Sequence, residues 1–245
     1  MIGEVARLSR TVNPVRPADV GRHDGLAYTR WLPTGERPAR GGVVILHGAG
    51  SCKESHHDFA RRLIAAGLAA IAFDQRGHGE SDGPMDGRAL DDVSSIAALL
   101  RARCSAPDLP LVLRGSSMGG CLALLAAPLV EPHAVVAICP ASTEGLRRGL
   151  RSGRFGFEAD APTLDALFAE QHLYETVESL EAPVLLMHAA GDEQVPVEHS
   201  RELAHALRSP ASRLIVVPGG HHRSVQHDAE LQAVSLRFIE KALAA

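Results

Sequence analysis

The sequence predicts an α/β protein built around a mostly parallel β-sheet. Short apolar runs alternate with longer amphipathic stretches along most of the chain, which is the pattern of repeated strand–helix units. The chain has 245 residues, of which 45% are hydrophobic, and this is enough for one sizeable core. We therefore expect a single domain over residues 1–245.

The apolar runs and the helical periodicity set the expected elements. We expect strands at 26–32, 43–46, 69–73, 111–113, 134–139, 184–188 and 214–217. Helices are expected at 53–66, 91–103, 118–127, 197–207 and 225–242. Gly67 directly follows the first of these helices, where a glycine commonly ends a helix.

The strand–helix alternation stops over residues 140–180. This stretch carries four arginines and then a run with helical spacing, which favours an inserted helical lid over a disordered loop. The arginines are Arg147, Arg148, Arg151 and Arg154. Arg147, Arg151 and Arg154 would share one helix face. A solvated face is the simpler interpretation, and an anion-binding lid is the alternative.

Composition excludes several classes of function. The net charge of −4 gives no basic surface for nucleic acid or for an anionic membrane. The 13 histidines are spread along the chain without the spacing of a metal motif, so we expect no metal. No organic cofactor is expected either, because the reaction predicted below needs none. The first residues lack the apolar core of a secretory signal, and no run of about 18 apolar residues could span a bilayer. A cytoplasmic protein is expected.

The segment Gly115-Ser116-Ser117-Met118-Gly119 matches the pattern G-x-S-x-G. It lies between a predicted strand and a predicted helix, as a nucleophile elbow requires. At such an elbow the serine adopts strained backbone angles, and the two glycines leave room for the neighbouring backbone. Ser117 is therefore the candidate nucleophile, and Ser116 is the weaker alternative.

A serine nucleophile needs a base and an acid that orients the base. Asp192 follows the strand predicted at 184–188, at the edge of the sheet where ligand-facing groups gather, and Glu193 is its competitor. The base lies in the run Gly219-Gly220-His221-His222, after the last predicted strand. Spacing within the chain leaves both His221 and His222 open. The order Ser, Asp, His is that of one large family of hydrolases.

Two segments could bind the oxyanion. His47-Gly48-Ala49-Gly50 follows a predicted strand, and its small residues would let backbone N–H groups approach a developing negative charge. Ala49 is the expected first donor, with Gly50 as the alternative, and the N–H of Met118 is the second donor. His56 and His57 are interpreted as surface residues at a helix start. The Gly-rich run 74–81 lacks the spacing of a phosphate loop and is interpreted as a brace for the site.

Together these motifs resemble the α/β-hydrolase superfamily. The runs HGAG, DQRGHGES, GSSMGG, HAAGDEQVP and GGHHRS occur in that family's order, from about residue 26 to the C-terminus. The resemblance implies an eight-stranded, mostly parallel sheet with helices on both faces and a small lid after the sixth strand. It also selects His222 over His221 as the base. The short lid is similar to that of small-lid bacterial serine esterases.

The function predicted from these observations is hydrolysis of a carboxylic ester of a small-molecule acyl substrate. Ser117, Asp192 and His222 would form the catalytic triad, with Ala49 and Met118 as oxyanion donors. Alternatives with the same triad are an acyltransferase, a thioesterase and a perhydrolase. A non-catalytic ligand-binding protein on the same scaffold is a further alternative. Ser117 argues against dehalogenation, because relatives with that chemistry have Asp at the elbow.

Overall fold

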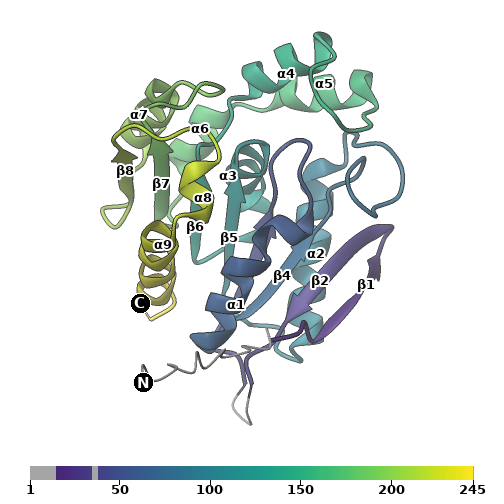
Figure 1. Cartoon of the computed structure of the whole chain (residues 1–245), viewed down its shortest axis with the longest axis vertical. Helices are drawn as coiled ribbons and strands as arrows, with labels where there is room; N and C mark the ends of the chain where they lie inside the picture. Colours follow the sequence, from purple (N-terminus) through teal and green to yellow (C-terminus); the bar gives the residue numbers. More distant parts are fainter. Residues whose placement is uncertain (1–14, 35–37, 245) are drawn as a thin grey trace, which may run out of the picture.

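The computed structural model describes residues 15–34 and 38–244, and in them one eight-stranded sheet forms the centre of the molecule (Figure 1). The strand order is β1-β2-β4-β3-β5-β6-β7-β8. β1 and β2 pair antiparallel with each other, and β2 pairs antiparallel with β4. All pairs from β4–β3 to β7–β8 are parallel. The predicted eight-stranded, mostly parallel sheet is confirmed.

The strands are short and mostly buried. They are β1 (Asp19–His23), β2 (Leu26–Trp31), β3 (Gly42–Leu46), β4 (Ala69–Phe73), β5 (Leu111–Ser116), β6 (Ala134–Ile138), β7 (Val184–Ala189) and β8 (Arg213–Val217). Every residue of the strands β2 to β7 is buried. Strands covered on both faces carry nearly continuous apolar runs, which is why these six were predictable from the sequence.

Helices cover both faces of the sheet. They are η1 (Lys53–His56), α1 (His57–Ala65), α2 (Ala89–Arg103), α3 (Met118–Val130), α4 (Thr143–Arg151), α5 (Ala161–Glu170), α6 (Leu173–Ser179), α7 (Val197–Ala206), α8 (Ser224–His227) and α9 (Ala229–Ala242). Within the described ranges, none of them combines the length and the apolar character that crossing a membrane requires.

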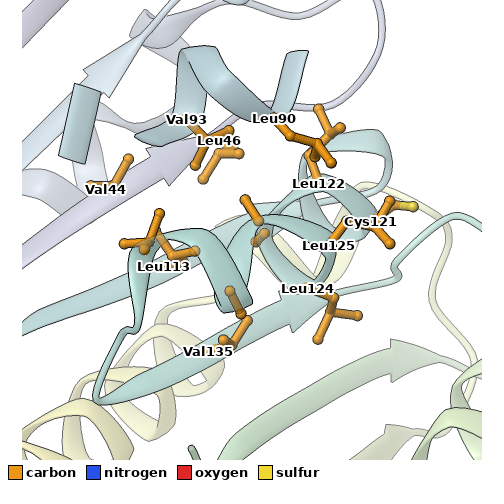
Figure 2. Packing of buried hydrophobic residues seen from close by; sticks show 14 of the residues in the cluster. Val44, Leu46, Leu90, Val93, Leu113, Cys121, Leu122, Leu124, Leu125 and Val135 are labelled. Carbon is orange, nitrogen blue, oxygen red and sulfur yellow. The ribbon is translucent and has the colours of Figure 1, made fainter. Parts of the chain in front are cut away.

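The side chains of each strand divide between two hydrophobic cores. Val44 and Leu46 of β3 belong to the core formed with α2 and α3, whereas Val43 and Ile45 belong to the core formed with α1 and α9. This division follows from the two-residue period of a strand. Figure 2 shows the first core, where Leu122 and Leu125 of α3 are surrounded by residues of α2 and the sheet. α3 is buried on nearly all sides, so the elbow before it sits on a rigid support.

Three elements differ from the sequence prediction. β1 was not predicted, because its five residues alternate between partly buried and exposed and include Asp, Arg and His. The helix expected at 53–66 is a short 3-10 turn followed by α1. The helix expected at 225–242 is two helices, because the Asp228 carboxylate accepts hydrogen bonds from Glu230 and Leu231 N–H and starts α9 there.

Three helices, α4, α5 and α6, occupy the segment between β6 and β7. α4 and α5 lie at the top of the view in Figure 1, beyond the sheet. Ser142 caps the start of α4, since its hydroxyl accepts the Gly145 N–H, and the helix ends two residues before Gly153, which has a φ of 63°. Arg154 therefore lies in the loop after α4 and not on its face, so the predicted shared face of Arg147, Arg151 and Arg154 is wrong for Arg154.

Candidate active site

Ser117 stands at the sharp turn between β5 and α3. Its φ of 54° and ψ of −119° lie in a region that side-chain-bearing residues rarely adopt. A side chain at Gly115 would collide with the Gly119 carbonyl, and one at Gly119 would collide with the Leu46 and His47 carbonyls. The Ser117 N–H donates to the Ile138 carbonyl at 2.8 Å, which ties the turn to the end of β6. Both flanking glycines are thus required by close backbone contacts.

The loop after β3 lies beside Ser117. A Cβ built on Gly48 would be 3.2 Å from the Cβ of Ser117. Gly48 and Ala49 both line the cavity that contains Ser117. Met118 is the first residue of α3, so its N–H has no acceptor within that helix, while its side chain is buried in the core. The two predicted oxyanion segments are therefore neighbours of the Ser117 hydroxyl.

His47 fixes the orientation of this loop. Burial lowers the pKa of His47 to about 4, so the ring is neutral at pH 7. Its Nε2 accepts the Gln75 N–H at 3.0 Å, which leaves the proton on Nδ1, and Nδ1 lies 2.8 Å from the Gly48 carbonyl. The Gly48 carbonyl also accepts the Ser51 N–H. Because a trans peptide carries C=O and N–H on opposite sides, the Ala49 N–H points away from these partners.

Asp192 and His222 are in direct contact. Asp192 lies in the loop after β7 and His222 in the loop after β8, and the His222 Nδ1 is 2.7 Å from the Asp192 Oδ2. The His222 ring is largely buried and the Asp192 carboxylate is fully buried. His222 and Ser117 line the same cavity. His221 is exposed instead, and its Nδ1 accepts the N–H of Arg223.

The Asp192 carboxylate has several donors besides His222. Burial by itself would raise the pKa of Asp192, but the N–H groups of Val195 and Gln194 on Oδ1, together with His222, outweigh it and hold that pKa below its usual value. The carboxylate is therefore ionised at neutral pH. An ionised carboxylate at 2.7 Å keeps a proton on the Nδ1 of His222 and leaves the Nε2 free to accept one.

His188, at the end of β7, is a second histidine on this carboxylate. Burial lowers its pKa, so it is neutral. Its Nε2 lies 3.0 Å from the Val195 carbonyl and 3.3 Å from the Asp192 Oδ2, and only a protonated Nε2 can satisfy the carbonyl. Its Nδ1 then accepts the Ser200 hydroxyl at 2.6 Å. His188 was not singled out from the sequence, because its role depends on contacts between distant segments.

Cys139 completes a group of three potential metal ligands with Asp192 and His222, whose ligand atoms lie within 4.8 Å of one another in the described part of the chain. The chemistry of this group favours a hydrogen-bonded pair over a metal centre. Burial raises the pKa of Cys139 to about 12, so without a metal its sulfur is a neutral thiol. Asp192 and His222 already satisfy each other at 2.7 Å.

The cavity at the site has a volume of about 530 Å³. This is within the range of pockets that bind small molecules. It lies between the loops after β3, β5, β7 and β8 on one side and α4 with its following loop on the other. Its apolar side chains include Leu146 of α4 and Phe155 of the loop after it. The segment between β6 and β7 thus forms one wall of the cavity.

The run 74–81 supports the site from behind. The buried Asp74 accepts the Lys53 N–H and the Glu80 N–H, and its Oδ2 is 2.8 Å from the Lys53 Nζ. The Gln75 side chain donates to the His47 carbonyl at 2.6 Å. His78 contacts His47 edge-on, with ring centroids 4.8 Å apart. These contacts agree with the interpretation of this run as a brace.

One interpretation from the sequence needs correction. His56 was expected at the surface, but it is 2% exposed, and its Nδ1 lies 3.4 Å from the Nη1 of the fully buried Arg114. Arg148 and Arg151 of α4 are largely exposed, as expected for a solvated face, and Arg147 and Arg151 also pair with Asp165 of α5. His57 is half-buried and packs edge-on against Trp31.

Comparison with known proteins gives the same fold. Residues 37–153 match the family model described as serine aminopeptidase, S33, and residues 168–242 match that of the TAP-like proteins. A monoacylglycerol lipase from Paleococcus ferrophilus superposes with a TM-score of 0.70 at 21% identity, over 89% of this chain and 98% of the lipase. The chain belongs to the α/β-hydrolase superfamily.

Two further relatives extend over most of this hydrolase. Est1E from Butyrivibrio proteoclasticus, solved with ferulic acid bound, has a TM-score of 0.70 at 22% identity and covers 93% of this chain and 98% of its own. A monoacylglycerol lipase of Mycolicibacterium smegmatis is 28% identical over 243 residues, which cover 80% of this chain and 85% of the lipase. The family and these relatives support a hydrolase of the lipase and esterase type.

Proposed function

We propose that this α/β-hydrolase cleaves a carboxylic ester through an acyl-enzyme, with Ser117 as nucleophile, His222 as base and Asp192 as the acid that orients His222. The observation that supports this most strongly is the 2.7 Å contact between Asp192 and His222 Nδ1 beside a cavity that also contains the strained Ser117. Three segments far apart in the sequence meet there, each directly after a strand of the sheet.

The proposed reaction has two steps. The His222 Nε2 takes the proton of the Ser117 hydroxyl while Oγ adds to the ester carbonyl, and the resulting oxyanion accepts the N–H groups of Ala49 and Met118. His222 then gives its proton to the departing alcohol, which leaves the acyl group on Ser117. In the second step His222 deprotonates a water that adds to the acyl carbonyl, and the proton returns to Ser117 as the carboxylic acid leaves.

The Ala49 assignment is supported by the orientation of its peptide. The hydrogen bond from His47 Nδ1 to the Gly48 carbonyl turns the Ala49 N–H to the opposite side. We propose that this N–H faces the oxyanion, where the loss of one donor typically costs about 10²–10³ in rate. The segment 140–180 is proposed as the lid of this site, because α4 and the loop after it line the cavity.

The direct test is hydrolysis of p-nitrophenyl acetate and butyrate by Ser117→Ala. We expect kcat to fall by at least about 10⁴-fold, because only binding and oxyanion stabilisation remain. The adjacent histidines His221 and His222 provide a matched control. His222→Ala and Asp192→Asn should lose activity by a similar order, while His221→Ala, which alters an exposed ring outside the cavity, should keep it. Undiminished turnover by the Ser117 variant would refute the assignment.

A further inference from the structure

The cavity at Ser117 has a distinctive charge. Arg148, Arg154 and Arg223 line it, whereas Glu193 is the one carboxylate among the lining residues of the described chain. The protein as a whole has a net charge of −4, so this excess of positive charge is local and opposite in sign to the average. A cavity lined by one sign of charge concentrates ligands of the opposite sign.

Two of these arginines are available to a ligand. Among the described residues, Arg154 and Arg223 have no carboxylate within ion-pair distance, in contrast to Arg147 and Arg151, which share Asp165. Arg148 pairs with Glu144 one turn away, but both side chains are largely exposed, and such a pair is weak. Guanidinium groups with free donors suit the two oxygens of a carboxylate or phosphate.

The backbone that carries Arg154 is held in place. Its N–H donates to the Gly149 carbonyl at 3.1 Å, and the next residue, Phe155, packs closely on Gly149. Phe155 stacks with Phe157 at 5.3 Å between ring centroids, and Phe157 stacks on His78 at 4.2 Å. Arg154 is therefore attached to the run that braces the catalytic loop.

Glu193 offsets only part of this charge, because it is one carboxylate against three lining arginines. Its Oε2 accepts the His222 N–H at 3.3 Å and its Oε1 accepts the Gln194 side chain at 3.4 Å. Arg223 is the residue directly after His222 in the chain. The cavity therefore keeps an excess of positive charge next to the proposed base.

We infer that the substrate carries an anionic group, a carboxylate or a phosphate, that binds to Arg154 and Arg223 while the ester carbonyl lies at Ser117. This inference rests on the proposed function and adds a substrate class to it. The lining also includes Gly48, Ala49, Gly145 and Gly156, whose small size leaves room for a substrate beside Ser117.

The test compares esters that differ in charge and little else. Mono-p-nitrophenyl terephthalate, whose para carboxylate cannot reach its own ester, is paired with its methyl ester, which places the charge on the acyl part. 4-Acetoxybenzoate is paired with methyl 4-acetoxybenzoate, which places the charge on the leaving group. In at least one pair we expect the charged ester to have about tenfold higher kcat/KM, mainly through a lower KM, because charge-assisted hydrogen bonds favour the anion. This ratio should decrease as salt is added.

Variants identify the residues responsible. Arg154→Gln with Arg223→Gln should bring the charged-to-neutral ratio to about one, and Arg154→Lys with Arg223→Lys should restore part of it. Arg151→Gln is the matched control, because Arg151 lies on α4 but pairs with Asp165 outside the cavity, and it should keep the wild-type ratio. Equal kcat/KM within both ester pairs, or a preference that survives the double Gln variant, would overturn the inference.

Two inhibitors distinguish the source of the anion. Succinate and inorganic phosphate are tested as competitive inhibitors of neutral-ester hydrolysis. The stronger inhibitor indicates whether the anionic group of the substrate is a carboxylate or a phosphate. Inhibition that weakens in the double Gln variant supports the site, and absence of inhibition by both counts against it. Hydrolysis of the neutral ester that depends on Ser117 but shows no charge preference would refute only this inference. Activity that survives Ser117→Ala would refute the proposed function itself.

Discussion

At the scale of single residues, the site depends on neutral histidines whose proton positions are fixed by their partners. His47 holds its proton on Nδ1 toward the Gly48 carbonyl, and His188 holds its proton on Nε2 toward Val195 and Asp192. Burial lowers the pKa of both rings, so neither gains a second proton near neutral pH. Each ring therefore orients a neighbour that is proposed to take part in the reaction.

This arrangement makes His188 a positioning residue for Asp192. We expect His188→Leu to lower kcat about tenfold, because the buried carboxylate loses a donor. The acid limb of the kcat/KM profile should move to higher pH, since a carboxylate with fewer donors holds a proton more tightly. His188→Gln, which can keep a donor near the position of Nε2, should retain most of both properties. An unchanged pH profile in a folded His188→Leu protein would show that His188 supports only the fold.

The sequence identified the residues of the candidate site whose identity is tied to a local motif. Ser117 stands in a five-residue pattern, and Asp192 and His222 follow strands in the order that one fold requires. His47 and His188 could not be assigned, because their partners lie in other segments and their pKa values depend on burial. His56 was misjudged for the same reason, since its sequence neighbours are polar while the side chain meets Arg114 inside the protein.

At the scale of elements, predictability followed burial. The strands β2 to β8 were expected because their apolar runs are distinct, while β1 was missed because an edge strand exposed on one face has no such run. Helix ends were less predictable, since each depends on a single capping side chain or a single glycine. The Asp228 cap separates α8 from α9, and Gly153 ends α4 before Arg154.

The connection of η1 to the run 74–81 depends on a buried ion pair. The side chains of Lys53 and Asp74 are 2% and 0% exposed. We expect Lys53→Met to lower the free energy of unfolding by about 3–5 kcal/mol, because Asp74 would stay buried without its cation. Urea unfolding measures this change. Arg201→Gln, which breaks the exposed pair with Glu198, is the control and should change the value by no more than about 0.5 kcal/mol. Equal effects of the two substitutions would contradict the account.

At the scale of the whole molecule, the buried histidines couple stability to pH. Burial lowers the folded-state pKa of His47 to about 4, and it also lowers those of His56, His188 and His199. In the unfolded chain these groups take up protons below about pH 6.5, which the folded protein cannot do. Protonation therefore favours the unfolded state, and stability should decrease as the pH falls from about 6.5 toward 4.

For His47 alone this contribution is roughly 3 kcal/mol, because its pKa differs between the two states by more than two units. Asp192 adds a loss of the same sign at lower pH, when the pH falls through its depressed folded-state pKa. Urea unfolding at pH 7.5, 6 and 5 measures the decline, and His47→Gln should make it shallower. A free energy of unfolding that stays constant from pH 7.5 to 5 would contradict this coupling.

The whole fold also explains why four loops that are distant in the sequence can form one site. Parallel strands end at the same edge of the sheet, so the loops after β3, β5, β7 and β8 meet there, and α4 covers them from the other side. The positive charge of the cavity arises at this meeting point, since Arg154 and Arg223 come from loops about 70 residues apart. Arg223 stands in the GGHHRS run and Arg154 in the arginine-rich stretch after β6. Nothing in the sequence shows that these two loops meet at one cavity, which is why the sequence alone did not join the two arginines.

The most direct measurement is the intact mass of the protein after reaction with a fluorophosphonate, followed by mapping of the modified peptide. The account predicts one adduct per chain, located on Ser117, that forms slowly in His222→Ala and is absent in Ser117→Ala. An unmodified wild-type protein, or an adduct on any other residue, would contradict the central claim that Ser117 is an activated nucleophile.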